Sequence, residues 1–230
     1  MLSAANNRAK EVFNTSKMTF IAVIVITSLI SSLVNEIAGR TGFFLLYILA
    51  ALVEGVVAAC SSCFFFRAVN RGTPDTRDLT DILNMKEHYS TIAAIALVNL
   101  AILAVPDLLG RLFPDMLLMN FAISLGSFFL SVVFSAVWFL FIANPHYNTA
   151  VYFHASLKYI GSHFWGYIGF EFYHIMIILL VGILAVILNI VGVLFFIPFI
   201  IMYIPYLTLA VAAYVSQLIP DEWYMGTAQF

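Results

Sequence analysis

The sequence predicts an all-α membrane protein with six transmembrane helices arranged in three hairpins. Hydrophobic residues make up 63% of the chain and charged residues only 10%. The mean hydropathy of +1.02 lies far above that of soluble proteins. Apolar runs long enough to cross a bilayer recur between short polar segments. These observations predict a polytopic protein whose main surroundings are the lipid bilayer.

The expected spans follow from the apolar runs and the polar breaks between them. Residues 35–41 form a polar turn, Pro106 ends the third run, and the run at 164–218 is too long for one span of about 20 residues. Asn189 with Gly192 is its natural break. The spans are therefore expected at residues 18–34, 42–66, 91–105 and 116–143, with two more inside 164–218. The membrane domain covers 18–218, between an N-terminal segment at 1–17 and a tail at 219–230.

Polar segments beside the spans have features of helices that lie at a membrane interface. In the N-terminal segment the apolar residues fall at helical spacing, which predicts a short helix on the membrane surface; they are Ala5, Ala9, Val12 and Phe13. Residues 67–90 are the most charged and contain a short apolar face. Residues 144–163 are rich in Tyr, His and Phe, which favour the headgroup level. We expect both segments to be amphipathic and interfacial.

The positions of lysine and arginine predict the orientation. With the N-terminus inside, every basic residue except Arg40 and Arg111 faces the cytosol. Both termini are then cytosolic. A net charge of −2 with scattered basic residues gives no indication of nucleic-acid binding.

The second span contains an acid, Glu54, near its middle. Small residues surround it at helical spacing, with Ala51, Gly55 and Ala59 on one row. Such a face is built for close helix contact, with a membrane partner or a second copy of the chain. An ionisable group at membrane depth costs about 2.5 to 3.5 kcal/mol on insertion scales and is a candidate functional residue. The competing interpretation is a structural hydrogen bond across a packed helix pair.

Other polar residues within the spans share helix faces. The fourth span carries a stripe made of Asn120, Ser124, Ser127, Ser131 and Ser135. In the fifth, Glu171 and His174 lie on one face, and in the sixth Tyr203 and Tyr206 do. At a rise of about 1.5 Å per residue, Glu54 and His174 both fall in the middle third of the membrane, where they are able to pair. The hypothetical ligand-binding set is Glu54, Ser127, Ser131, Glu171, His174 and Tyr206; packing is the more common use of a serine stripe.

Signatures of enzymes and metal sites are weak. Glu171 and His174 have the Glu-x-x-His spacing of di-metal bundles, but those bundles need the motif twice with two more glutamates. Cys60 and Cys63 have redox spacing without a neighbouring strand-helix unit, and they read as small packing residues. We predict no catalytic residue, no metal and no cofactor.

Short motifs along most of the chain resemble a known family. They are Ala9-Lys10-Glu11, Asn70-Arg71-Gly72 leading into Asp78-Leu79, Asn144-Pro145 with Ala155-Ser156-Leu157-Lys158, and Ile204-Pro205-Tyr206. In this respect the chain resembles the six-helix bacterial membrane proteins of domain-of-unknown-function family nine-seven-five. The resemblance implies a bacterial inner-membrane protein and a fold, and it supplies no catalytic residue.

Three functions are open on this basis. The favoured one is a non-enzymatic accessory or partner subunit of a transport or envelope system, because no soluble domain is present to power transport or perform catalysis. The second is a solute-binding membrane subunit or small transporter with a polar pocket at the midplane. The third is an intramembrane enzyme that uses Glu171 and His174.

Overall fold

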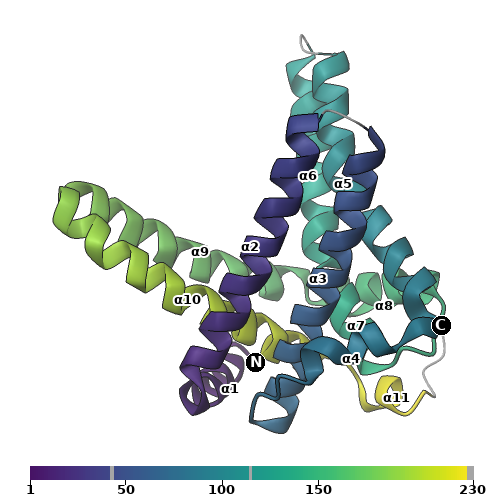
Figure 1. The fold of residues 1–230 in the computed structure, drawn as a ribbon, viewed down its shortest axis with the longest axis horizontal. Helices are drawn as coiled ribbons and strands as arrows, with labels where there is room; N and C mark the ends of the chain where they lie inside the picture. Colours follow the sequence, from purple (N-terminus) through teal and green to yellow (C-terminus); the bar gives the residue numbers. More distant parts are fainter. Residues whose placement is uncertain (42–43, 114–115, 227–230) are drawn as a thin grey trace.

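The computed structural model describes residues 1–41, 44–113 and 116–226, and every regular element in these ranges is helical (Figure 1). The helices are α1 (Leu2–Thr15), α2 (Lys17–Thr41), α3 (Phe44–Arg71), α4 (Asp78–Asn84), α5 (Tyr89–Leu112), α6 (Leu117–Phe134), α7 (Val137–Ala143), α8 (Thr149–Ser162), α9 (Phe164–Ile187), α10 (Asn189–Leu218) and α11 (Asp221–Tyr224). Along the chain α2 packs on α3, α5 on α6, and α9 on α10.

Five segments of the described chain are long and apolar enough to cross a membrane. They are Lys17–Arg40, Leu45–Arg71, Leu118–Ala143, Phe164–Ile187 and Gly192–Leu218. Helix α5, where the third span is predicted, has 24 residues, but several of its side chains lie outside the described residues. A chain with several membrane-spanning helices is therefore supported, while the sixth span and the three membrane hairpins stay predictions.

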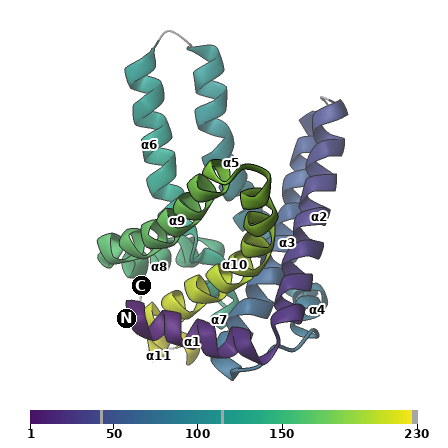
Figure 2. The same ribbon diagram turned by 90° about the vertical axis from the view of Figure 1, so that its left-hand side faces the viewer.

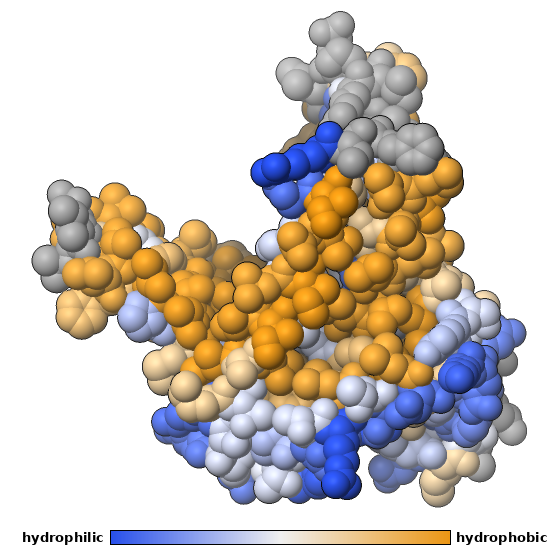
Figure 3. Space-filling model, in the orientation of Figure 1, coloured by the Kyte–Doolittle hydropathy of each residue, from blue (hydrophilic) through white to orange (hydrophobic). Residues whose placement is uncertain are grey.

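The three helix pairs meet at one polar end and diverge beyond it. Figure 3 shows hydrophilic residues gathered along one end of the molecule, where α1, α4, α8 and α11 lie in Figure 1, and apolar residues over the pairs. The α9–α10 pair points away from the other two at a wide angle (Figures 1 and 2). Helix α10 is buried around Leu209, near the polar end, whereas Phe195 near its other end is exposed. The common core therefore lies at the polar end.

The centre of that core is the last part of α3. Phe64, Phe65 and Phe66 are almost fully buried. Phe20 of α2 packs against the first two, with ring centroids 5.4 and 5.7 Å away, and Phe139 of α7 lies 5.6 Å from Phe66. Burying one such ring contributes about 1.5 to 3 kcal/mol. Helix α10 also packs on α3. Helix α3 therefore contacts all three helix pairs.

The N-terminal helix forms where its pattern predicts, but it packs on protein. The buried residues of α1 are Ala5, Ala9, Val12 and Phe13, the same four that predict an amphipathic helix, and they pack mainly on α10. Arg8 Nε donates to the Val69 carbonyl oxygen at 3.0 Å, near the end of α3. A cation at this place also interacts favourably with the helix dipole. Helix α1 therefore closes the polar end of the fold.

A buried carboxylate holds α4 against the end of α3. Asp78, at the start of α4, is only 2% exposed. It accepts hydrogen bonds from Arg67 at 3.1 Å and from Arg71 at 3.2 Å, and Arg67 also pairs with Asp81. Two cations thus offset the cost of burying one acid. Of the predicted charged segment at 67–90, the first five residues thus belong to α3, and α4 is folded onto the end of that helix.

The C-terminal segment is also part of the core. Trp223 in α11 is fully buried, and its Nε1 donates to the Leu140 carbonyl oxygen at 2.9 Å. Asn144 Nδ2 donates to the Trp223 carbonyl oxygen at 2.9 Å, and Tyr152 Oη donates to the Asn144 carbonyl oxygen at 3.0 Å. Burial raises the pKa of the Tyr152 hydroxyl. Up to residue 226 the predicted polar tail is therefore anchored on α7 and α8.

Some predicted boundaries are wrong. The expected turn at 35–41 is helical, because α2 continues to Thr41. Pro106 lies inside α5, which ends only at Leu112. The fourth span, in contrast, agrees with the segment Leu118–Ala143, although a turn at Ser135 and Ala136 separates α6 from α7 within it. Within a bilayer an unpaired backbone group is costly, so helices continue past polar residues and proline until they leave the apolar layer.

The break in the last apolar run is confirmed. Helix α9 ends at Ile187 and α10 begins at Asn189. A Cβ on Gly192 would lie 2.2 Å from the Ala185 carbonyl oxygen, so only glycine allows this close return. Pro198 and Pro205 lie within α10, which stays one helix and curves along its length (Figure 2).

We predict that Trp223→Ala lowers the free energy of unfolding by about 3 to 5 kcal/mol, because it removes a fully buried ring and its hydrogen bond. The measurement is thermal or denaturant unfolding of the purified protein. Trp165→Ala is the matched control, since Trp165 is 79% exposed, and it should leave unfolding nearly unchanged. Equal effects of the two substitutions would contradict the anchored tail.

We predict that Asp78→Asn destabilises the protein by about 1 to 3 kcal/mol, because both arginines lose a charged partner while remaining partly solvated. Asp75→Asn is the control, since Asp75 is half-buried and lies 3.9 Å from Arg71. Limited proteolysis after Arg77 should also become faster in Asp78→Asn alone. An unchanged unfolding midpoint would show that α4 is held by its apolar face.

Candidate functional site

Glu54 lies on α3 and is held by a residue of α2. Asn35 Nδ2 donates to Glu54 Oε1 at 2.5 Å. The side chain of Glu54 is half-buried. In the described part of the chain its other oxygen, Oε2, has neither a hydrogen bond nor an ion pair. The arrangement gives an oriented carboxyl group with one oxygen available.

The small-residue face beside Glu54 packs inside the chain. Ala51, Gly55 and Ala59 are all buried. A Cβ on Gly55 would lie 2.2 Å from Ala96 Cβ and 4.0 Å from Trp138 Cζ2. Glycine at this position therefore sets the close approach of α3 and α5. Docking of a partner or second copy on these three residues stays a prediction, but within one chain α5 already covers the face.

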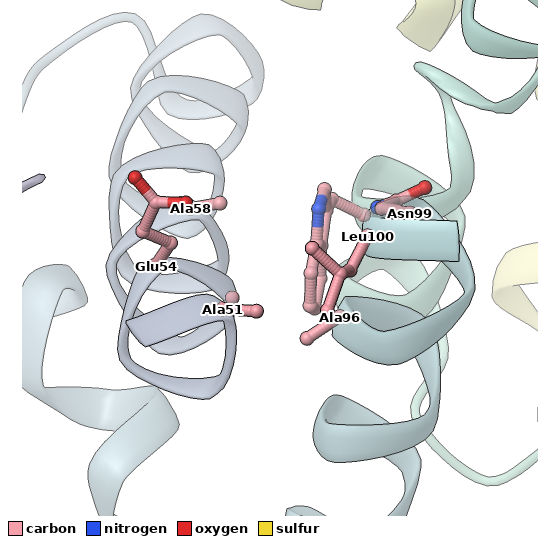
Figure 4. A pocket seen from close by; sticks show the side chains of 8 residues that line it. Ala51, Glu54, Ala58, Ala96, Asn99 and Leu100 are labelled. Carbon is pink, nitrogen blue, oxygen red and sulfur yellow. The ribbon is translucent and has the colours of Figure 1, made fainter. Parts of the chain in front are cut away.

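A cavity opens next to this close contact. Its volume is about 140 Å³, and it is lined by Ala51, Glu54, Gly55, Ala58, Ala96, Asn99, Leu100 and Trp138. Figure 4 shows Glu54 and Ala58 on one wall and Asn99 and Leu100 on the facing wall. Carboxyl, amide and indole groups are the polar parts of an otherwise apolar lining. We refer to it as the Glu54 cavity.

A second cavity adjoins the Glu54 cavity and shares part of its wall. Its volume is about 250 Å³, and Asn99 and Trp138 line both cavities. Ser131 and Ser135 line only the second. The two residues of the shared wall therefore separate the acid from the serine stripe.

The serine stripe connects the second cavity to α9. Ser135 Oγ and Tyr167 Oη are 2.8 Å apart. The Tyr167 hydroxyl interacts in turn with the Glu171 carboxyl group, one turn further along α9. This series of polar groups joins α6 and α9 at the point where the helix pairs diverge. These groups serve as one another's polar partners, which is typical of hydrogen bonding between membrane helices.

His174 belongs to a separate aromatic cluster between α9, α10 and α1. Its Nδ1 lies 2.6 Å from Tyr203 Oη, and Tyr206 Oη donates to Asn6 Oδ1 at 3.3 Å. The ring of Phe170 is 4.8 Å from the His174 ring. His174 Nε2 is buried and has no hydrogen-bond partner among the described residues. The cluster ties the N-terminal helix to the last helix pair.

The predicted ligand-binding set does not converge. Glu54 lines one cavity and Ser131 the next, while Ser127 lines neither. Glu171 reaches the second cavity only through Tyr167 and Ser135, and His174 and Tyr206 lie in the aromatic cluster. The proposed pair of Glu54 with His174 is not formed, because each side chain has a different partner. Ligand binding by the individual residues stays a prediction.

The polar groups that sequence reasoning missed are Asn35, Asn99 and Trp138. Asn35 falls in the predicted turn at 35–41, but it lies on α2 and contacts the acid. Asn99 is a polar residue inside an apolar run, which is itself a signal for an interhelical contact. Trp138 gives no such signal, because aromatic residues are common throughout the spans.

Among the described residues no three His, Cys, Asp or Glu side chains lie close enough together to hold a metal ion. Cys60 and Cys63 are free thiols on α3. Glu171 and His174 turn to different partners, so the Glu-x-x-His spacing does not bring the two groups to a common point.

Comparisons with family models, curated proteins and solved structures give no match. The resemblance to domain-of-unknown-function family nine-seven-five therefore stays a prediction. Function has to be inferred from the geometry alone.

We predict that Gly55→Ala destabilises the protein by about 1 to 3 kcal/mol, because the new methyl group overlaps Ala96. Gly126→Ala is the matched control, since a Cβ there meets nothing within 4 Å. The double variant Gly55→Ala with Ala96→Gly should recover most of the loss in thermal unfolding. Failure of this rescue would show that α3 and α5 do not touch at these residues.

Proposed function

We propose that this chain is a non-enzymatic membrane protein that acts as a partner subunit of a transport or envelope system. The observation that carries the proposal is the shape of the apolar region. The helix pairs share their main core at the polar end; beyond it α3 still touches α5 at Gly55 and Ala96, whereas the α9–α10 pair stands apart (Figures 1 and 2). Separate pairs offer long helix faces to other membrane helices.

The α9–α10 pair offers the largest such face. Large apolar side chains are exposed on both helices, among them Leu180, Ile183, Leu194 and Phe195. A bilayer covers such residues. Helices in lipid also gain van der Waals contact by packing together, so the bilayer alone does not explain why this pair stands apart from the rest of the bundle. A partner helix seated between α2 and the α9–α10 pair would supply that contact.

The solute-binding alternative is supported less well. The described cavities lie between neighbouring helices, and of the six predicted ligand residues only Glu54 lines one cavity and Ser131 the other. A substrate-binding subunit surrounds its solute with helices, which needs a bundle closed on all sides. One observation favours this alternative, namely the unsatisfied carboxyl oxygen in the Glu54 cavity.

Orientation and location complete the proposal. Arg8, Arg67, Arg71 and Asp78 all belong to the polar end where α1 and α11 also lie. A concentration of Lys and Arg at one end supports a cytosolic position for it. We therefore propose that both termini are cytosolic, and the resemblance to the bacterial family implies an inner-membrane location.

The proposal is tested by site-specific photo-crosslinking in native membranes. A photoreactive residue at Leu180, which is 59% exposed, should give a discrete adduct with one membrane protein. The same residue at buried Phe170 is the control and should crosslink only within the chain. The adduct partner should also co-purify with the chain in a fixed ratio. Lipid adducts alone, with a monomer in native nanodiscs, would overturn the partner role.

A further inference from the structure

The Glu54 cavity has the features of a binding site for a small cation. Its one carboxyl group has an unpaired oxygen, and no Lys, Arg or His among the described side chains forms an ion pair with it. Asn35 fixes the other oxygen from outside the cavity wall. A carboxylate in apolar surroundings is stabilised by an opposite charge nearby. The cavity therefore lacks the positive partner that its acid favours.

The lining indicates which kind of cation fits. A metal ion such as Ca²⁺ takes about six to eight oxygen ligands and Mg²⁺ about six, whereas this cavity offers the carboxyl group of Glu54 and the amide of Asn99. The remaining lining is Ala, Gly and Leu with one indole, Trp138. Apolar walls suit carbon groups, and an indole attracts cations through its ring. An organic ammonium ion matches both parts of the lining.

The volume limits the size of the ligand. The cavity measures about 140 Å³, close to the roughly 150 Å³ of an engineered protein cavity that binds benzene. A ligand of about five or six non-hydrogen atoms therefore fills it. Tetramethylammonium and butylammonium have this size, and because the cavity is open on one side, a longer amine would extend out of it.

We propose that the Glu54 cavity binds a small organic ammonium ion, with Glu54 as the counter-ion, Asn99 as a polar contact and Trp138 as the aromatic wall. The proposal does not depend on a partner role for the α9–α10 pair, because the two sites share no residue. A protein that fails the crosslinking test above still binds the cation, and the reverse also holds.

The test uses the full-length protein in nanodiscs of neutral lipid, titrated with tetramethylammonium or butylammonium chloride and followed by tryptophan fluorescence and thermal unfolding. Sodium chloride at the same concentration controls for ionic strength. We expect saturable binding that shifts the unfolding temperature upward. Glu54→Gln should weaken binding by about tenfold or more, because the cation loses its counter-ion.

Two further variants separate binding from folding. Glu36→Gln is the matched control, because Glu36 is an exposed acid on α2 that pairs with Arg40, and its binding should equal that of the unmodified protein. Ala58→Leu fills the cavity while keeping the charge, and it should abolish binding even though Glu54 remains. Absence of saturable binding to the unmodified protein, or equal binding by Glu54→Gln, would overturn the proposal.

Discussion

The structure depends on the burial of one short part of α3, the three consecutive phenylalanines at residues 64–66. Consecutive residues of a helix point in different directions, so three buried neighbours require protein on nearly every side. Helices α2, α7 and α10 provide it. Beyond this point α3 still touches α5 at Gly55 and Ala96, whereas the α9–α10 pair stands apart from the other two. The strength of the whole fold is therefore concentrated at its polar end.

Because the core lies at the polar end, polar groups there are more buried and have more hydrogen-bond partners than polar groups in the apolar region. At the polar end, Asp78 and Asn144 are buried and have several partners each. In the apolar region, Glu54 is only half-buried and has one. A tightly packed core supplies hydrogen-bond partners for each polar group it encloses, whereas helices that diverge leave empty space beside their polar groups. The Glu54 cavity lies beside the point where α3 and α5 come closest, at Gly55 and Ala96.

Sequence reasoning predicted what depends on local periodicity. The buried face of α1 and the break before α10 follow from helical spacing and from turn residues. Sequence reasoning was wrong where a side chain's partner depends on which helices contact each other. Glu54 and His174 lie at similar expected depth, but depth does not state whether α3 faces α9. The actual partner, Asn35, lies on α2, which directly precedes α3 in the chain. Looking for a polar residue on the adjacent helix would therefore have predicted this contact.

The contact of α1 with α10 has a consequence for how the protein is made. Asn6 and Tyr206 are 200 residues apart in the sequence, so at about 5 to 20 residues per second the ribosome needs on the order of 10 to 40 s to join them. During that time α10, which makes most of the contacts with α1, is absent. The membrane surface is the nearest place that accepts an amphipathic helix. The α1–α10 contact therefore requires the face of α1 to wait for α10, and the membrane surface suits it during that wait.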